Sequence, residues 1–342
     1  AMVDVGVGAV AHVIDFRYFL VSLTGVFLAL AVGVALGAGP FRGELDDQLR
    51  SDLRQVGLEK DDLRGRIHKL QQVDRYRDTF AKDLAPNLVH GRLANQEIVL
   101  VALPGADTAM VKDVGNIVTA AGGAVTGTVR VQPKWADPGE RQFLEDLAGR
   151  LVTGTTAASA GSAYERAGSV LAGALVTEDD RAAGRRDSTT ATVVGAFGEG
   201  GLVDAPAALP RARFAVVIAP PATSRTGGQG ATTADISSEG ADGSALEGTA
   251  FGEPWVELAR ALDDAGRGVV MAGEVSAAAG ERGALASLRN DSRASDSVST
   301  VDVADLPSGQ VAIVWALAEQ SEGGAGHYGA VGTTDGALPT NP

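Results

Sequence analysis

A long apolar segment stands near the start of the chain. No residue between Tyr18 and Phe41 is charged, and Arg17 and Arg42 flank the segment. As a helix, its central part over residues 19–38 would span about 30 Å, because each helical residue rises about 1.5 Å. That length matches the hydrocarbon core of a bilayer. We therefore predict a transmembrane helix over residues 18–41, preceded by a short N-terminal segment over residues 1–17.

Two other interpretations of this segment stay open. The Ala-Leu-Gly-Ala sequence before Gly39 is compatible with the cleavage site of a secretory signal peptide, although such peptides have shorter apolar runs. A buried helix of a globular core is the second alternative. A membrane anchor is favoured over both, because so long a charge-free run seldom occurs in a soluble core.

Small residues recur on one face of the predicted transmembrane helix. Gly25, Ala29, Gly33 and Gly37 follow one another at steps of four residues, and Gly33 and Gly37 form a GxxxG pair. Small side chains let two helix backbones approach closely in lipid, which predicts helix packing through this face. The alternative is that Gly and Ala are simply frequent in this segment.

A charged segment with a regular apolar stripe follows over residues 42–85. Ten Lys or Arg and ten Asp or Glu occur within it up to residue 83, so their charges cancel. Apolar residues occupy the a and d positions of a heptad, and polar Lys60 and Asp74 interrupt the a positions. The predicted coiled-coil seam consists of Leu49, Leu53, Val56, Leu63, Ile67 and Leu70. We predict a stalk helix that pairs with a second copy of the chain. The alternative is an amphipathic helix that folds back onto its own domain.

The apolar stripe changes register near the end of the stalk. Tyr76, Phe80 and Leu84 follow at steps of four residues, outside the simple heptad. A dimer packed through the seam would leave them uncovered, so they are candidates for docking a partner protein. The alternative is that they pack onto the chain's own domain. Pro86 is expected to end the helix.

Short apolar runs alternate with helical patterns over residues 90–320. Strands are predicted at residues 98–103, 124–131, 214–219, 268–272 and 298–303. Helices are predicted at residues 107–121, 140–152, 163–176, 254–265 and 309–319. This alternation predicts an α/β domain in which helices cover both faces of a mainly parallel sheet.

Two segments are rich in small and polar residues. Residues 222–249 contain 15 Gly, Ser or Thr, which predicts a disordered insertion between a strand and a helix. Residues 321–342 are rich in Gly and are predicted to form a flexible tail.

Charge and composition limit the partners of the chain. A net charge of -14 at pH 7 disfavours binding to the phosphate backbone of nucleic acids. The chain has no Cys, so it forms no disulfide and offers no thiolate to a metal. Arg17 precedes the apolar segment and Arg42, Arg50 and Arg54 follow it, which leaves the membrane topology open.

Motifs of enzymatic chemistry are absent from the sequence. It contains no GxxxxGK[ST], no GxSxG and no GxGxxG after the first predicted strand. Copper(I) prefers thiolate, thioether or imidazole ligands, and the chain offers no local group of these. Its Met and His residues are dispersed as Met2, Met110, Met271, His12, His68, His90 and His327. We therefore expect no catalytic residue, no cofactor and no local metal site.

Several stretches of the sequence are similar to those of one known family. They are residues 15–39, the Val-Ala-Leu-Pro-Gly-Ala turn at 101–106 and the Gly-His-Tyr-Gly motif at 326–329. Together with the charged stalk, they resemble the MctB family of actinobacterial envelope proteins over essentially the whole chain. The insertion at 222–249 departs from the family pattern.

The resemblance implies a function in the cell envelope. The family is described as a mycobacterial copper-transport protein, linked to copper efflux and the outer membrane. Its members are also described as cell-division factors with one inner-membrane helix and a dimeric coiled coil. In that description they act with a partner membrane protein to control a peptidoglycan hydrolase. The resemblance further implies that the C-terminal part is exported to a periplasm-like space.

Two functional hypotheses follow. In the first, the chain is a single-pass, homodimeric interaction module that lies in membrane lipid and binds an envelope protein, such as a peptidoglycan hydrolase or its regulator. In the second, it is a component of copper export and copper homeostasis, acting indirectly or with other chains.

Overall fold

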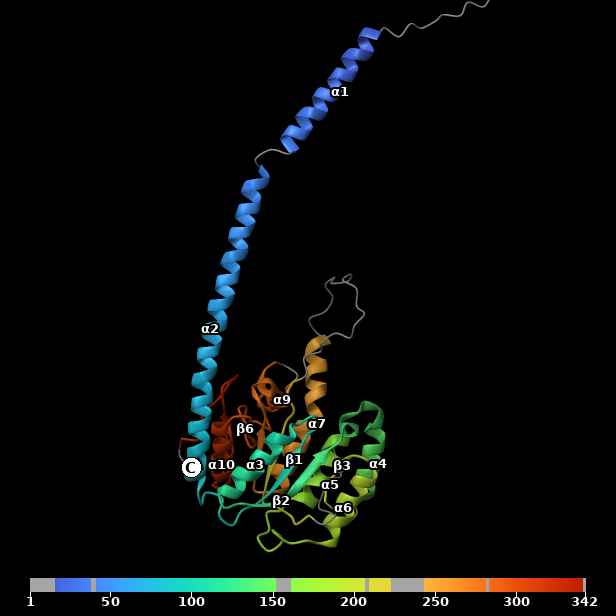
Figure 1. Ribbon diagram of the computed structural model, residues 1–342. Helices are drawn as coiled ribbons and strands as arrows, with labels where there is room; N and C mark the ends of the chain where they lie inside the picture. The colour runs from blue at the N-terminus through green and yellow to red at the C-terminus, as the bar shows by residue number, and fades with distance from the viewer. Residues whose placement is uncertain are drawn as a thin grey trace, which may run out of the picture. The chain divides into compact units, whose positions relative to one another are not determined.

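The chain divides into two compact units, Ala1–Asp74 and Arg75–Pro342 (Figure 1). This computed structural model describes residues 16–37, 41–151, 161–206, 209–222, 243–280 and 283–340. Side chains at positions 16, 36–52 and 243–251 lie outside the described part. The first unit contains α1 and most of α2, and the second contains the end of α2 and the whole sheet.

Helix α1 (Phe16–Gly37) coincides with the predicted membrane helix. By length and composition Arg17–Ala35 could cross a membrane, and none of it is buried inside the protein. A helix that is apolar on all sides is stable only in an apolar environment. Helix α1 is therefore suited to contact with lipid.

Helix α2 (Phe41–Val89) is continuous and contains the whole predicted stalk. It also continues past Pro86, at which the sequence predicts its end. Proline removes one backbone hydrogen bond and crowds the carbonyl group four residues earlier, which normally interrupts a helix. Here Ala85 and Val89 are buried in the domain core, and their packing stabilises the last turn.

A mostly parallel sheet of seven strands forms the centre of the second unit. Its strands are β1 (Glu97–Ala102), β2 (Ala124–Val131), β3 (Val203–Asp204), β4 (Phe214–Ile218), β5 (Gly268–Ala272), β6 (Ser299–Val301) and β7 (His327–Tyr328). The spatial order is β3-β2-β1-β4-β5-β6-β7, and the pairing is parallel except between β2 and β3. The predicted mainly parallel sheet is confirmed.

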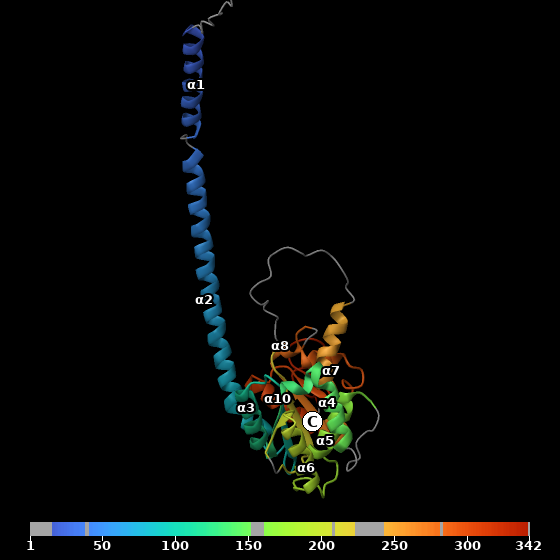
Figure 2. The ribbon, with the colours of Figure 1, turned by 90° about the vertical axis from the view of Figure 1, so that its right-hand side faces the viewer.

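Helices cover both faces of the sheet. They are α3 (Thr108–Ala120), α4 (Arg141–Leu151), α5 (Ala163–Leu175), α6 (Ser188–Glu199), α7 (Gly243–Ala265), α8 (Val275–Ala278), α9 (Ala284–Asn290) and α10 (Pro307–Ser321), with 3-10 turns η1 (Pro133–Ala136) and η2 (Pro138–Glu140). In Figure 2, α3 and α10 lie on one side of the sheet, and α4, α5 and α7 lie on the other.

Alternating strand residues enter two separate cores, as the period of a strand requires. Val99 and Val101 of β1 belong to the core beneath α5, α6 and α7. Ile98 and Leu100 belong to the core beneath α3 and α10, which also contains Val89 from the end of α2. Because the side chains on both faces of each central strand are buried, these strands appear in the sequence as continuous apolar runs.

Besides the end of α2, other segments of the structure differ from the sequence predictions. Helix α6, capped by Asp187, is absent from the prediction because its Thr, Val and Gly residues have low helix propensity. Helix α7 begins at Gly243 instead of Pro254, so it overlaps the predicted insertion, of which residues 223–242 lie outside the described part. The predicted flexible tail contributes strand β7 and returns along it through a bridge between Tyr328 and Gly336.

Candidate functional site

The small-residue face of α1 is open along its described length. Gly25, Ala29 and Gly33 are all exposed. No atom lies within 4 Å of the position that a Cβ would take on Gly25 or Gly33. Gly37 belongs to α1, but its surroundings lie outside the described residues. This face is therefore accessible to a second helix.

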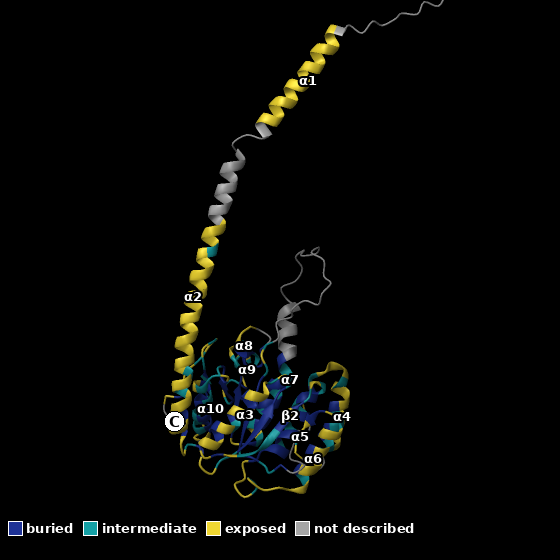
Figure 3. Ribbon diagram, in the orientation of Figure 1, coloured by how far each residue is buried: buried dark blue, intermediate teal, exposed yellow. Residues whose placement is uncertain are grey.

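The predicted seam forms an exposed apolar stripe on α2 (Figure 3). Leu63 and Leu70 keep 58% and 63% of their surface accessible, and Ile67 between them is also exposed. Leu53 and Val56 continue the stripe toward α1. The side chain of the sixth seam residue, Leu49, lies outside the described part. Apolar surface in water costs about 25 cal/mol for each Å², so covering this exposed stripe would be favourable.

The three candidate docking residues are exposed in the last turns of α2. Phe80 keeps 55% of its surface accessible, Tyr76 and Leu84 are exposed as well, and the rings of Tyr76 and Phe80 stack with 6.4 Å between their centroids. Another side of the helix faces the domain, where Ala85 and Val89 are buried. The contact with the domain is therefore made by Ala85 and Val89, and the aromatic face points elsewhere.

The carboxyl ends of β1 and β4 flank the point at which the strand order reverses, where α/β proteins commonly bind ligands. Gly105 after β1 lies against Pro220 after β4, since a Cβ on Gly105 would be 3.4 Å from the Cβ of Pro220. Asp107 caps α3, and its carboxylate accepts a hydrogen bond from the amide of Ala109 at 2.9 Å. A phosphate at this helix end would compete with Asp107 for the amide of Ala109.

Thioether and imidazole ligands are spread over the structure. Met110 and Met271 are buried in different cores, while His68 is exposed on α2 and His90 is exposed in the turn after it. In the part of the chain that the structure describes, no three His, Asp or Glu side chains lie together as metal ligands would. The described residues therefore bring together no local copper site.

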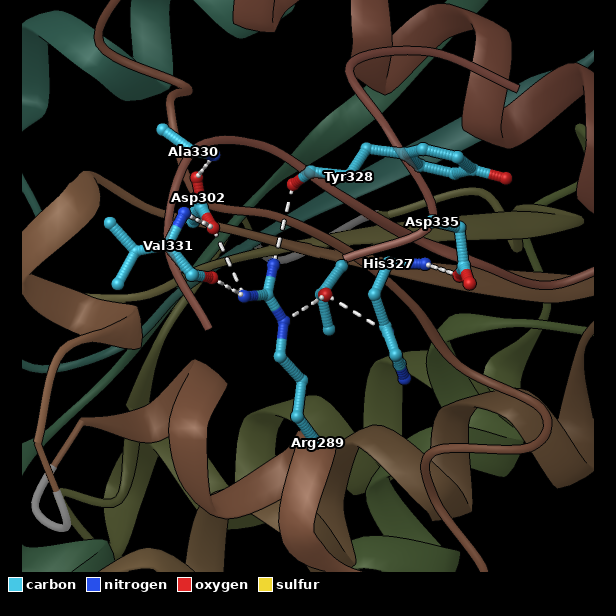
Figure 4. A network of polar contacts seen from close by, with 8 residues as sticks. Arg289, Asp302, His327, Tyr328, Ala330, Val331 and Asp335 are labelled. Carbon is cyan, nitrogen blue, oxygen red and sulfur yellow. Dashed lines mark hydrogen bonds and ion pairs between the residues drawn. The ribbon is translucent and has the colours of Figure 1, made fainter. Parts of the chain in front are cut away.

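Arg289, at the end of α9, is the centre of a buried polar network (Figure 4). Its Nη1 lies 3.0 Å from Oδ2 of Asp302, and the two side chains are only 6% and 0% exposed. The Nε of Arg289 donates a hydrogen bond to Oγ1 of Thr300 at 2.8 Å. Its terminal nitrogens also donate to the carbonyl oxygens of Val331 and Tyr328, at 2.7 and 3.3 Å. One side chain thus joins α9, β6 and the C-terminal segment.

Asp302 joins the same segment through its carboxylate. It accepts hydrogen bonds from the amides of Ala330 and Val331 at 2.7 and 3.2 Å. Gly329 passes so close that a Cβ there would overlap the carboxylate of Asp302. Each buried charge therefore has an opposite charge and further hydrogen bonds, which offset the cost of removing it from water. These partners belong to the chain itself, so the network is a structural connection.

His327, in β7, contacts the network through Thr300. Its Nδ1 lies 3.0 Å from Oγ1 of Thr300, and its backbone amide donates to Oδ2 of Asp335 at 2.8 Å. Burial lowers the pKa of His327, and the positive charge of Arg289 lowers it further, while the carboxylates of Asp335 and Asp296 oppose this shift.

The sequence predictions miss this network, although two signals for it are visible. Asp302 lies near the end of a predicted strand of the parallel sheet, and a carboxylate that is buried at such a strand end needs a partner. The motif at 326–329 places His327 and Tyr328 between two Gly residues. The partner of Asp302 is not visible in the sequence, because Arg289 is one of many Arg residues on helices.

Known proteins are similar to this chain over nearly its full length. A family described as "Copper transport outer membrane protein, MctB" matches residues 13–339. A protein named copper transporter MctB from Mycobacterium tuberculosis H37Rv is 30% identical over 338 residues, which cover 95% of this chain and 98% of the relative. The protein of the same name from Mycobacterium leprae is 28% identical over 339 residues, with the same shares covered. The chain, with its apolar α1, its stalk helix and its α/β domain, belongs to the MctB family.

Proposed function

We propose that this protein is an interaction module of the cell envelope that is anchored by α1 and dimerises through α2. The observation that carries this proposal is the apolar stripe of Leu63, Ile67 and Leu70, which is exposed in the single chain. In a second helix of the same sequence, these residues would find an identical stripe. Packing the two stripes together removes both from water, which favours association.

Charges beside the stripe support a parallel arrangement of the two copies. With Val56 and Leu63 at successive d positions of the heptad, Glu59 occupies g and Arg64 occupies the following e position. In a parallel dimer these two positions face each other across the seam. Glu59 would then lie opposite Arg64 of the partner subunit, and the pair would have opposite charges.

The small-residue face of α1 is consistent with the same arrangement. Gly25, Ala29 and Gly33 would let the two membrane helices approach each other directly before the stalk. In this proposal α1 lies in the cell membrane as the single span, and the domain that follows the stalk is exported. The outer-membrane association that the family description names belongs to this proposal as a further expectation.

The exposed end of α2 would bind a further envelope protein. Tyr76 and Phe80 offer a stacked aromatic pair, and aromatic residues are frequent among those that dominate binding energy. Leu84 extends the same surface. On the family resemblance, the expected partner is a peptidoglycan hydrolase or a regulator of one.

Site-specific crosslinking tests the proposed dimer, because the natural chain has no Cys. A Leu63→Cys variant in native membranes should form a disulfide between two copies, since a disulfide needs Cα atoms about 4.4–6.8 Å apart. A Gln72→Cys variant, on the outer side of the stalk, is the matched control and should remain reduced. Equal crosslinking of both variants, or none of Leu63→Cys, would contradict a parallel seam at this position.

Crosslinking at the end of α2 tests the partner surface separately. A photo-reactive residue in place of Phe80 should capture a second protein from native envelopes, whereas one in place of the neighbouring Thr79 should not. Capture from both positions would indicate chance encounters. With the photo-reactive residue in place of Tyr76 instead, a Phe80→Asp substitution should abolish the specific product.

A role in copper export is the second candidate function, and the family match favours it. The described residues hold no local group of copper ligands, so we propose that copper handling proceeds with other chains. Copper(I) titrated onto the purified full chain measures this directly. Binding tighter than micromolar with a fixed stoichiometry would show that the chain handles copper itself, against the scaffolding proposal.

A further inference from the structure

The outer edge of β6 is covered by residues 326–336, which we call the C-terminal clasp. The amides of Thr300 and Asp302 donate hydrogen bonds to the carbonyl oxygens of Gly326 and Tyr328, at 3.0 and 3.1 Å. The clasp then turns back on itself, because the amide of Gly329 donates to the carbonyl oxygen of Gly336 at 3.0 Å. Strand β7 is thus the end of the sheet, and β6 would become the end without it.

Few apolar contacts hold the clasp in place. Of residues 326–336, all of which the structure describes, Tyr328 alone has a buried side chain. Its hydroxyl donates a hydrogen bond to Oε2 of Glu319 at 2.5 Å. Most of the other side-chain attachments are polar contacts to Arg289 and Asp302, as Figure 4 shows. Thr300 contacts His327, and Ser299 accepts a hydrogen bond from the amide of Gly326. Segments with little apolar burial open more readily than the core, so the state of this network decides how firmly the clasp is held.

The direction of the hydrogen bond between Thr300 and His327 depends on the protonation of the imidazole. Oγ1 of Thr300 accepts a hydrogen bond from Nε of Arg289, which leaves its hydroxyl hydrogen free to donate to Nδ1 of His327. A neutral imidazole with its proton on Nε2 accepts this hydrogen bond at Nδ1. A proton added at Nδ1 would reverse the hydrogen bond, which then uses the second lone pair of Oγ1, and would place a second positive charge near Arg289.

Three charged groups act on His327, one from α9, one from the segment before β6 and one from the clasp itself. Arg289 of α9 is the cation that faces it, through Thr300 of β6. Asp296, before β6, and Asp335, within the clasp, are the carboxylates that favour its protonated form. Burial and Arg289 together outweigh these two carboxylates, so the pKa of His327 in the closed state lies below its ordinary value.

We propose that the C-terminal clasp is a pH-sensitive strap, which opens when His327 takes up a proton and thereby uncovers the edge of β6. Protonation places a positive charge on His327 in a half-buried position and sets it against the positive charge of Arg289 across Thr300. In the open state both cations are in water, where their repulsion is screened. The uncovered backbone of β6 is then free to pair with an added strand.

The sign of the pH dependence follows from the direction of the pKa shift. The open state binds a proton at the ordinary value of 6.5, and the closed state binds it only at lower pH. Closure is therefore most favourable above pH 6.5 and weakens as the pH falls toward the lowered value. The equilibrium shifts toward the open state by about tenfold for each unit by which the pKa is lowered.

Hydrogen exchange of the full chain in detergent, compared at pH 7.5 and 5.5 and corrected for intrinsic exchange rates, tests this proposal. Peptides that contain Thr300, Asp302 and Gly329 should lose protection at the lower pH, while β4 (Phe214–Ile218) should not. A His327→Gln variant cannot take up the proton and should show no such pH dependence. A His90→Gln variant, changed at an exposed position, should behave as the natural chain does.

Three outcomes would overturn the proposal. One is equal protection of the clasp at both pH values in the natural chain. Another is an equal loss in β4, which would indicate unfolding of the whole domain. The third is a titration of the imidazole resonances in which His327 has a pKa at or above the ordinary value of 6.5, a measurement that does not depend on any variant folding.

Discussion

The carboxylate of Asp302 lies 3.0 Å from the guanidinium of Arg289, and both groups are removed from water inside the sheet edge. The two residues come from different elements, since Arg289 belongs to α9 and Asp302 follows β6. Their pairing also positions the amides of Ala330 and Val331, which bind the same carboxylate. The C-terminal segment is therefore part of the domain through a charge pair as much as through β7.

Loss of Arg289 should strongly destabilise the domain. An Arg289→Met variant leaves Asp302 buried without its counter-charge, and removing one partner of a buried pair typically costs about 3–5 kcal/mol. Arg293→Met is the matched control, because Arg293 is exposed on the following turn. Urea unfolding of the full chain measures the difference, and equal stability of the two variants would show that the pair is not needed.

A methyl group on Gly329 should be poorly tolerated. Its φ is +140°, and a Cβ would overlap Oδ1 of Asp302. Backbone strain and crowding together predict a cost of roughly 3 kcal/mol or more for Gly329→Ala. Gly323 has a φ of +84° but nothing within 4 Å of the Cβ position, so Gly323→Ala should cost only about 1 kcal/mol. Similar unfolding midpoints for both variants would contradict the observed close approach.

Asp263 of α7 should reduce stability at neutral pH. Burial raises its pKa, with the charge of Asp264 adding to the effect and a hydrogen bond from Ser297 opposing it. A raised pKa means that this group's contribution is greatest below the ordinary value of 3.8 and is lost as the pH rises through the folded-state pKa. Asp263→Asn should therefore raise Tm at pH 7, by about 2–4 °C for each kcal/mol gained.

The pH dependence of Asp263→Asn provides an internal control for the role of charge. Its advantage over the natural chain should disappear in acid below the ordinary value of 3.8, where the carboxyl group of Asp263 is protonated in both states. Asp264→Asn, at an exposed position, should leave Tm nearly unchanged. An advantage of Asp263→Asn that persists in acid would point to packing instead of charge.

Lys60 should weaken the stalk dimer and limit the number of chains that assemble. It occupies an a position of the proposed seam, where a polar residue lowers stability but restricts the number of chains. Lys60→Leu should tighten association by about 1.5–3 kcal/mol and admit larger oligomers. Lys69→Leu, on the outer side of the helix, is the control. Sedimentation equilibrium in detergent measures both, and an unchanged dissociation constant for Lys60→Leu would exclude this seam.

Local patterns in the sequence determine much of this protein. The charge-free run specifies α1, the heptad specifies the exposed stripe of Leu63 and Leu70, and continuous apolar runs specify the central strands β1, β4 and β5. Each of these signals arises from neighbouring residues in the chain, where the period of a helix or strand sets which side chains share a face.

The tertiary structure alone decides what depends on contacts between distant segments. The order of the seven strands, the continuation of α2 through Pro86 and the inclusion of residues 327–328 in the sheet all result from packing that no local period encodes. The pairing of Arg289 with Asp302 is of the same kind. Burial makes an unpaired charge costly, so the fold selects which Arg meets this carboxylate, and the sequence shows only that a partner is needed.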